Sequence, residues 1–259
     1  MIDPGELLEK IEKTADPACE IAMKYYGKVE PSYKKDRSFL TSADLEIEEL
    51  LTGELPRIIE GSVVVGEETS LDPAARQAVR AAEWVWVIDP IDGTASFVDR
   101  LPNFCISIGL TRNGQPYAGV LRFPVTGDRY ESVIGHGAFH NKKKVSLAPD
   151  IQINYNSTVY VYSNFHKRFR VDFQGKLRNL GSTAGHIALL GRGAGVGVLA
   201  HGSVWDYMGA AAVLLEAGGE LRYFDGREIN WPATLTVSGK LGAPVVGAPK
   251  GRFEEIAGA

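Results

Sequence analysis

The segment WVWVIDPIDGTASF, residues 84–97, constrains the fold of this chain more than any other. Its first five residues, Trp84–Ile88, are apolar and are typical of a buried strand. Asp89 and Asp92 follow at the end of that strand, and Pro90 fixes the backbone between them. The segment therefore predicts a strand that ends in a stiff turn carrying two carboxylates, although a turn without function can have the same composition.

The residues after this turn favour a functional site. Gly93 allows close approach of the backbone to a ligand, and Thr94 adds a hydroxyl. Mg²⁺ prefers oxygen ligands, so Asp89 and Asp92 could share one ion or bridge two. The backbone N–H groups from Gly93 to Ala95, at an expected helix start, could hold a phosphate.

A second pair of acids follows another predicted strand, Ser62–Val65. Glu67 and Glu68 come at its exit, in the sequence Gly66-Glu67-Glu68-Thr69. Adjacent glutamates at the end of a strand are usually solvated. Acids that converge on one place repel one another unless a cation neutralises them, so a neighbouring strand that also ends in acids favours a metal site.

Two further acids, Asp44 and Asp206, stand near the starts of predicted helices. An aspartate at the start of the helix 205–217 is more often an N-cap than a metal ligand. Asp44, near the start of the helix 42–59, could stabilise that helix through its dipole or orient a catalytic hydroxyl. Neither residue alone decides between these roles.

Periodicity predicts helices and strands along the whole chain. A helix over 4–26 ends at Gly27, and residues 34–37 form a polar loop or hairpin. Ser42 is expected to cap the second helix, which Pro56 could kink. Strands are expected at 104–111, 117–123 and 128–134 as an antiparallel meander, then at 158–162 and 196–199, with a short helix at 184–190. We expect an α+β fold of layered helices and sheets.

Composition bounds the class of protein. The 259 residues are 44% hydrophobic, which is enough for a large core. The 28 basic and 32 acidic residues do not suggest a nucleic-acid binder. Two cysteines make a disulfide framework unexpected and favour a reducing compartment. No signal peptide or membrane-length apolar run is seen, so we expect a cytoplasmic protein without membrane association.

Taken together, these motifs resemble the inositol monophosphatase family of lithium-sensitive, magnesium-dependent phosphatases. They occur in the family order and span most of the chain: Thr41-Ser42-Ala43-Asp44, Gly66-Glu67-Glu68-Thr69, Trp86–Thr94, Gly181-Ser182-Thr183-Ala184, Trp205-Asp206 and Glu216-Ala217-Gly218-Gly219. The Asp-Pro-Ile-Asp-Gly-Thr block with a downstream Trp-Asp pair is the most specific part of the resemblance.

The resemblance implies a layered αβαβα sandwich and a site that holds two or three Mg²⁺ ions, with Mn²⁺ as an alternative. Glu67, Asp89 and the Ile91 carbonyl would bind a first metal, and Asp89, Asp92 and Asp206 a second. Glu67 would help to hold a third, and Glu68 would tune the site.

The resemblance also implies which groups contact the substrate. The phosphate would contact Gly93, Thr94 and Ala95, with Asp92 and Asp206 also at the substrate. Thr94, Asp44 and Glu67 would position and activate a water for in-line attack on phosphorus. Gly181, Ser182 and Thr183 would bind the rest of the ester. A homodimer is expected by analogy.

One departure concerns the substrate. Many inositol-specific members carry a glutamate seven residues before the Trp-Asp aspartate, where this chain has Leu199, with His201 nearby. Inositol monophosphate is therefore one candidate beside histidinol phosphate, fructose 1,6-bisphosphate and 3′-phosphonucleotides. The basic residues at 166–176 could meet an anionic substrate or form a solvated loop.

Other classes of protein remain open. A regulatory protein on the same fold, or a carbohydrate- or nucleotide-binding module without metal, would be non-catalytic. We expect two halves: residues 1–148 with most metal ligands, and residues 149–259 with Asp206 and the residues that select the substrate.

Overall fold

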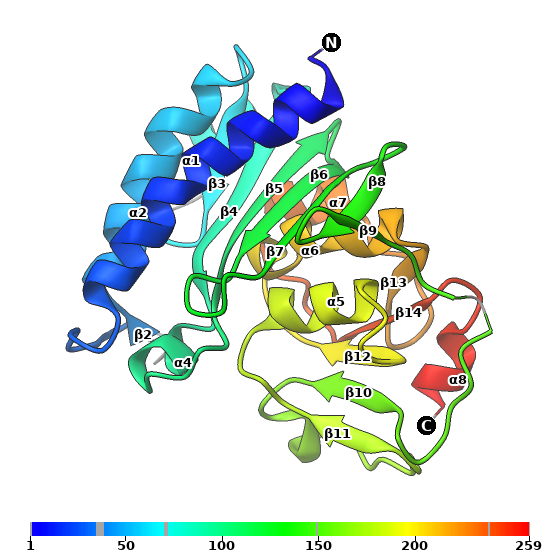
Figure 1. The fold of residues 1–259 in the computed structure, drawn as a ribbon. Coiled ribbons are helices and arrows are strands. Elements are labelled where there is room, and N and C mark those ends of the chain that lie inside the picture. The colour runs from blue at the N-terminus through cyan, green and yellow to red at the C-terminus, as the bar shows by residue number, and fades with distance from the viewer. Residues whose placement is uncertain (1, 35–38, 70–71, 149, 238, 259) are drawn as a thin grey trace.

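A computed structural model describes residues 2–34, 39–69, 72–148, 150–237 and 239–258. Helices and two large sheets alternate in five layers (Figure 1). In order, the layers are α1 (Pro4–Tyr25) with α2 (Ser42–Glu54), a seven-stranded sheet, α5 (Thr183–Gly191) with α6 (Val204–Glu216), a five-stranded sheet, and the short α8 (Phe253–Ala257). The expected αβαβα sandwich is confirmed.

The seven-stranded sheet carries the two acidic strand ends. Its strand order follows the sequence: β3 (Val63–Gly66), β4 (Trp84–Asp92), β5 (Cys105–Arg112), β6 (Gln115–Arg122), β7 (Arg129–Val133), β8 (Gly137–His140) and β9 (Lys143–Val145). β3 runs parallel to β4, and each later neighbour is antiparallel. Because β3 and β4 are parallel neighbours, Gly66 pairs with Ile88 and both acidic segments leave the same edge. The expected meander is confirmed, and β8 and β9 extend it.

The first two helices begin at residues that cap them. The Asp3 carboxylate accepts hydrogen bonds from the Gly5 and Glu6 N–H groups at 2.9 and 3.1 Å, and the chain leaves α1 at Gly27, whose φ is 76°. The prediction that Ser42 caps α2 is wrong, since Thr41 is the N-cap. Thr41 has an extended backbone, whereas Ser42 is already helical.

Pro56 does more than kink the second helix. The α-helix ends at Glu54, and a 3₁₀ turn, η1 (Leu55–Arg57), follows, since proline cannot donate the next helical hydrogen bond. The hairpin expected before α2 is present as β1 (Ser32–Tyr33) and β2 (Phe39–Leu40), while Lys35, Asp36 and Arg37 lie outside the described residues.

The five-stranded sheet is built from the second half of the chain. Its order is β11 (Lys176–Arg178), β10 (Thr158–Val161), β12 (Gly197–Ala200), β14 (Val245–Pro249) and β13 (Gly219–Tyr223). The strands expected near 158 and 196 and the helices expected near 184 and 205 are confirmed. The helix start expected at residues 93–95 is confirmed as α4 (Thr94–Val98). Elements that were not predicted include α3 (Pro73–Ala81), η2 (Phe165–Lys167), β11, β13, α7 (Trp231–Val237), β14 and α8.

Helix α6 packs unusually close to the first sheet. A Cβ built on Gly119 of β6 would lie 2.0 Å from the Gly209 carbonyl oxygen of α6, and one on Gly109 of β5 would lie 2.7 Å from the Gly209 nitrogen. These glycines are therefore required for the contact that brings the start of α6 to the sheet. α6 belongs to the second half and packs on the first, so the division at residues 148 and 149 stays a prediction; residue 149 is itself undescribed.

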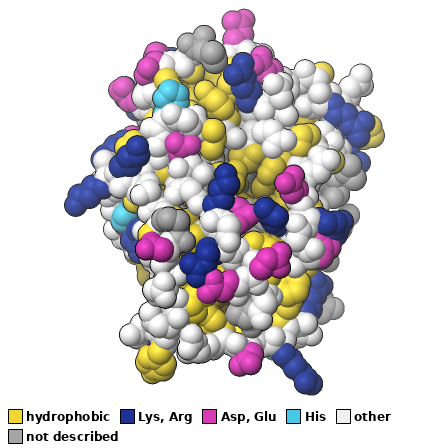
Figure 2. Space-filling view, turned by 90° about the vertical axis from the view of Figure 1, so that its right-hand side faces the viewer, with side chains coloured by type: hydrophobic (Ala, Val, Ile, Leu, Met, Phe, Trp, Pro, Cys, Tyr) yellow, Lys and Arg dark blue, Asp and Glu magenta, His cyan; other side chains and the backbone are white. Residues whose placement is uncertain are grey.

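The surface carries both signs of charge. On the face in Figure 2, basic and acidic side chains are intermingled, with apolar side chains between them. No helix in the described ranges is both long and apolar enough to cross a membrane.

Candidate functional site

The end of β4 forms the centre of the site. The pairing of β4 with β5 is regular up to Asp89, then shifts before Asp92, so the strand bulges at the Asp-Pro-Ile-Asp segment. The Ile91 N–H donates to the Asp89 carboxylate at 3.0 Å. Gly93 then takes a φ of 97°, and a Cβ there would lie 3.0 Å from the Gly181 carbonyl. The bulge and this left-handed glycine turn the chain directly into α4.

Asp92 is anchored by the start of α5. Its carboxylate accepts from the Ser182 hydroxyl, from the Thr183 N–H at 3.2 Å and from the Ala184 N–H at 2.8 Å. Ser182 and Thr183, which the resemblance assigns to the substrate, therefore bind a site carboxylate. This contact ties the second half of the chain to the end of β4.

Asp206 completes an acidic trio in which Asp89 and Asp92 are buried and Asp206 is half-buried. It is the third residue of α6 and accepts from the Ser203 N–H at 2.6 Å in a capping box. Asp89, Asp92 and Asp206 each offer an oxygen within 4.8 Å of the others, the only such group of potential ligands among the described residues. Two side chains from the end of β4 and one from α6, which is distant in the sequence, thus converge on one point.

Burial and neighbouring carboxylates raise the pKa of each acid of the trio. Burial raises the pKa of Asp206 to about 8, and the charges of Asp92 and Glu67 add to the rise. Burial also raises the pKa of Asp92 to about 6, against the hydrogen bonds that it accepts. The pKa of Asp89 is raised for the same reasons, by burial and then by Glu67, Asp92 and Asp206. A buried, all-oxygen, acidic donor set of this kind fits a hard divalent cation such as Mg²⁺.

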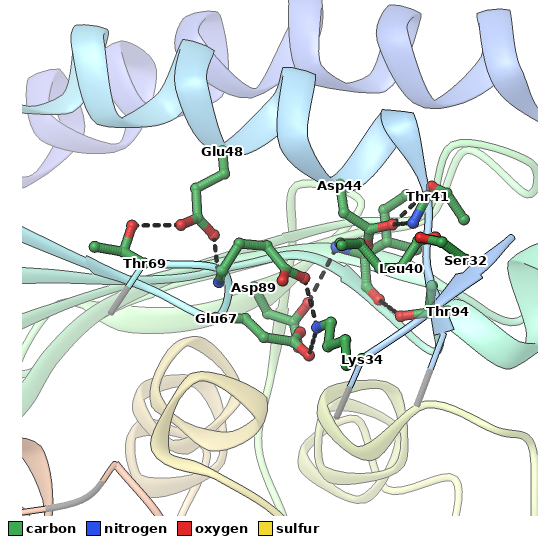
Figure 3. A network of polar contacts seen from close by, with 12 residues as sticks. Ser32, Lys34, Leu40, Thr41, Asp44, Glu48, Glu67, Thr69, Asp89 and Thr94 are labelled. Atoms are coloured by element: carbon green, nitrogen blue, oxygen red, sulfur yellow. Dashed lines mark hydrogen bonds and ion pairs between the residues drawn. The ribbon is translucent and has the colours of Figure 1, made fainter. Parts of the chain in front are cut away.

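Glu67 and Glu68 lie beside the trio and share one lysine. The Lys34 ammonium is 2.6 Å from an oxygen of each glutamate, and Figure 3 shows it next to Glu67. Burial opposes the charge on Lys34, but the two glutamates outweigh it and raise the Lys34 pKa. Burial, with repulsion from Glu67, raises the pKa of Glu68 to about 7 despite the Lys34 contact. The charge of Glu67 raises the pKa values of all three acids of the trio, although Glu67 is itself paired with the Lys34 ammonium.

Glu48 binds the segment that carries Glu67 and Glu68, a role that the sequence did not predict. Its buried carboxylate accepts from the Glu68 N–H at 2.9 Å and from the Thr69 hydroxyl (Figure 3). A Cβ on Gly66 would lie 2.4 Å from that carboxylate, which explains the glycine before the glutamates. The available signal was the spacing of Asp44 and Glu48, four residues apart on one helical face.

Asp44, in the first turn of α2, and Thr94, the first residue of α4, are the two other residues expected at the site. The Asp44 carboxylate accepts from the Thr41 N–H and hydroxyl at 2.8 and 2.6 Å through one oxygen. Its other oxygen is buried with no hydrogen-bond partner among the described residues. Burial raises the Asp44 pKa to about 6. The Thr94 hydroxyl donates to the Ile91 carbonyl at 3.1 Å, the group expected to bind metal.

A polar pocket with a volume of about 360 Å³ adjoins this centre, and Gly181, Ser182 and Thr183 line it. His201 lines it too, whereas Leu199 packs into the apolar cluster on the outer face of the five-stranded sheet. Leu199 therefore lies away from the predicted substrate end. Of the basic residues at 166–176, Arg168 lines the polar pocket and Lys176 bonds Asn156 instead.

Comparisons with known proteins point to one family. The pattern of the inositol monophosphatase family matches residues 3–257. A fructose-1,6-bisphosphatase/inositol-1-monophosphatase of Thermotoga maritima is 28% identical, covering 81% of this chain and 82% of the relative. A histidinol-phosphatase of Chlorobaculum parvum is 27% identical, covering 90% and 93%. The solved structure of a Thermotoga maritima IMPase superposes with a TM-score of 0.81 at 24% identity, covering 97% of this chain and 95% of the other.

Proposed function

Because the chain belongs to the inositol monophosphatase family, whose members are phosphoric monoester hydrolases, we propose that it is a Mg²⁺-dependent phosphatase of small phosphorylated metabolites. The observation that carries the choice of metal is the convergence of Asp89, Asp92 and Asp206 within 4.8 Å. Buried carboxylates at that spacing are unfavourable without a cation, and oxygen-only donor sets suit Mg²⁺ and Mn²⁺.

The residues divide between the metals as follows. Asp89, Asp92 and Asp206 would hold one ion, and Glu67, Asp89 and the Ile91 carbonyl another; Glu67 would also help to hold a third. Asp89 belongs to both sets, and both Glu67 and Asp206 raise the pKa of its carboxyl group. Glu68, paired with Lys34, would adjust the charge beside them.

Bound Mg²⁺ would neutralise the phosphate and lower the pKa of a water molecule for in-line attack on phosphorus. One buried oxygen of Asp44 has no hydrogen-bond partner in the described part of the chain, so it could orient the water or the Thr94 hydroxyl. The Thr94 hydroxyl would become available for this role when the Ile91 carbonyl, which now accepts its hydrogen bond, binds a metal ion instead. Glu67 would accept the proton as the water attacks.

The two ends of the ester would then contact different elements. The backbone N–H groups of Gly93, Thr94 and Ala95 follow the β4 bulge and are assigned to the phosphate. The polar pocket lined by Gly181, Ser182 and Thr183 is assigned to the leaving group.

A phosphate-release assay tests the proposal. We expect turnover of several esters among inositol 1-phosphate, histidinol phosphate, fructose 1,6-bisphosphate and a 3′-phosphonucleotide. EDTA should abolish that turnover and excess Mg²⁺ should restore it. Release that is indifferent to EDTA, or no release from any ester, would refute a metal-dependent phosphatase. The non-catalytic alternatives are disfavoured because every matched acid is retained.

A further inference from the structure

The polar pocket beside the acidic centre has one permanent charge. Arg168 is the only lysine, arginine, aspartate or glutamate among the described residues that line it. Arg168 is the residue directly after η2, and its side chain is exposed. Its guanidinium forms no ion pair with any carboxylate in the described ranges. An unpaired guanidinium at a pocket wall can bind phosphate or carboxylate through two parallel hydrogen bonds.

The two histidines of the pocket do not add to that charge at neutral pH. His186 accepts a hydrogen bond from the Leu180 N–H at 2.8 Å through Nε2, and burial lowers its pKa to about 4. Burial and then the nearby Arg168 lower the pKa of His201. Both rings are therefore neutral, and Arg168 sets the sign of the pocket.

The wall of the pocket is already formed. The Asn179 amide donates to the Ser163 hydroxyl at 2.8 Å, and its oxygen accepts from the Gly181 N–H at 2.8 Å. These bonds join the segment after β10, which leads to Arg168, to the segment that anchors Asp92. A ligand therefore meets a preorganised wall that runs from Arg168 to Ser182 and Thr183, which bind Asp92 of the acidic centre.

We propose that the leaving group occupies this pocket and that Arg168 binds a second anionic group on it. The preferred substrates are then phosphate monoesters that carry another phosphate or a carboxylate. The same positive charge disfavours leaving groups with an ammonium, such as that of histidinol phosphate. This inference rests on the proposed phosphatase function and narrows its substrate class.

Paired substrates test the second anion directly. Fructose 1,6-bisphosphate and fructose 1-phosphate differ by one phosphate, while 3-phosphoglycerate and glycerol 3-phosphate differ by one carboxylate. The wild-type protein should favour the doubly anionic member of at least one pair by roughly tenfold in kcat/KM, since a hydrogen-bonded charge pair has about that effect. The pair with the larger ratio identifies the anion.

Variants assign the preference to Arg168. Arg168→Met should bring the ratio close to one, mainly through a higher KM for the doubly anionic ester, and should improve histidinol phosphate relative to it. Arg168→Lys keeps the charge without the two-pronged geometry and should give an intermediate ratio. Lys167→Met removes a neighbouring exposed charge that does not line the pocket, and should keep the wild-type ratio.

Three results would overturn the proposal: a wild-type ratio near one in both pairs, an unchanged ratio in Arg168→Met, or an equal loss in Lys167→Met. A binding measurement separates this failure from that of the proposed function. Fructose 6-phosphate retains the second anion without an ester at C1, and its Kd for the Mg²⁺-loaded protein can be measured by calorimetry. We expect roughly tenfold weaker binding in Arg168→Met only. Equal affinity in wild type and Arg168→Met rejects the anion site, whereas absent turnover with Arg168-dependent binding rejects only the phosphatase.

Discussion

Replacing Asp206 by Asn should stabilise the metal-free protein at pH 8 and remove most of its response to Mg²⁺. The amide keeps an oxygen that can accept from the Ser203 N–H, so the start of α6 is preserved. It removes one of the three charges that face one another in the trio. A substitution of a proposed metal ligand should therefore be favourable to folding as long as no cation is present.

The magnitude follows from the Asp206 pKa, which burial, Asp92 and Glu67 raise from 3.8 to about 8. An acid whose folded pKa is raised contributes stability below its unfolded pKa, and that stability is lost as pH rises to the folded pKa. The loss spans about pH 4–8 and, at ~1.4 kcal/mol per pKa unit, has an upper bound of roughly 6 kcal/mol. Solvent access reduces our expectation to about 2–3 kcal/mol, or roughly 5–10 °C in Tm.

Thermal unfolding from pH 5 to 8.5, with EDTA or with saturating Mg²⁺, measures both effects. In EDTA, the wild-type Tm should fall relative to Asp206→Asn as pH rises; Mg²⁺ should raise the wild-type Tm most at high pH and the variant little. Asp3→Asn changes an exposed N-cap acid far from the trio and should behave as wild type. A wild type that is as stable as Asp206→Asn at pH 8 in EDTA would refute this electrostatic account.

Other predictions concern activity and packing. Asp89→Asn should nearly abolish phosphate release while the protein stays folded, because both proposed metal sets include Asp89; near-normal turnover at saturating Mg²⁺ would remove it from the mechanism. Lithium and Ca²⁺ should each lower the initial rate at fixed Mg²⁺, since Ca²⁺ requires longer and more numerous oxygen contacts, and indifference to both would contradict the proposed metal arrangement. Gly119→Ala places a Cβ 2.0 Å from the Gly209 carbonyl oxygen and should destabilise the protein by about 3 kcal/mol in urea unfolding. Gly53→Ala, in α2 with open space around it, should instead stabilise by about 0.5–1 kcal/mol, and equal effects of the two would count against the close packing of α6.

The part of the site that lies on β4 could be predicted from the sequence because its signals are local. An apolar run followed by Asp89, Pro90 and Asp92 specifies a strand, its end and two carboxylates within a few residues. The layer order could be predicted only through the family resemblance. Short strands such as β11 and β13 have no clear period, since β11 is exposed along most of its length and β13 alternates only partly.

Long-range contacts account for what the sequence could not predict. Nothing local indicates that Ser182 would donate to Asp92, ninety residues earlier in the chain. The sequence also could not predict to which side of the sheet Leu199 points, because β12 packs one face against α5 and the other against α8. The polar pocket is likewise lined by residues such as Arg168 and Asn179, whose positions depend on the fold of two separate loops.

The two interpretations of Asp44 and Asp206 are physically compatible, because a carboxylate can cap a helix with one oxygen and leave the other for a proposed site role. Both stand three positions after a Thr or Ser N-cap, and in both the carboxylate accepts the N-cap N–H in a capping box. The cap uses one oxygen; the other oxygen of Asp44 is buried with no hydrogen-bond partner among the described residues, and Asp206 also belongs to the acidic trio. Because the cap fixes the side chain relative to its helix, the helix start itself aims the remaining oxygen at the site. A capped helix start and a proposed site residue therefore have the same sequence pattern here, and only the convergence with β4 distinguishes these two helix starts from ordinary ones.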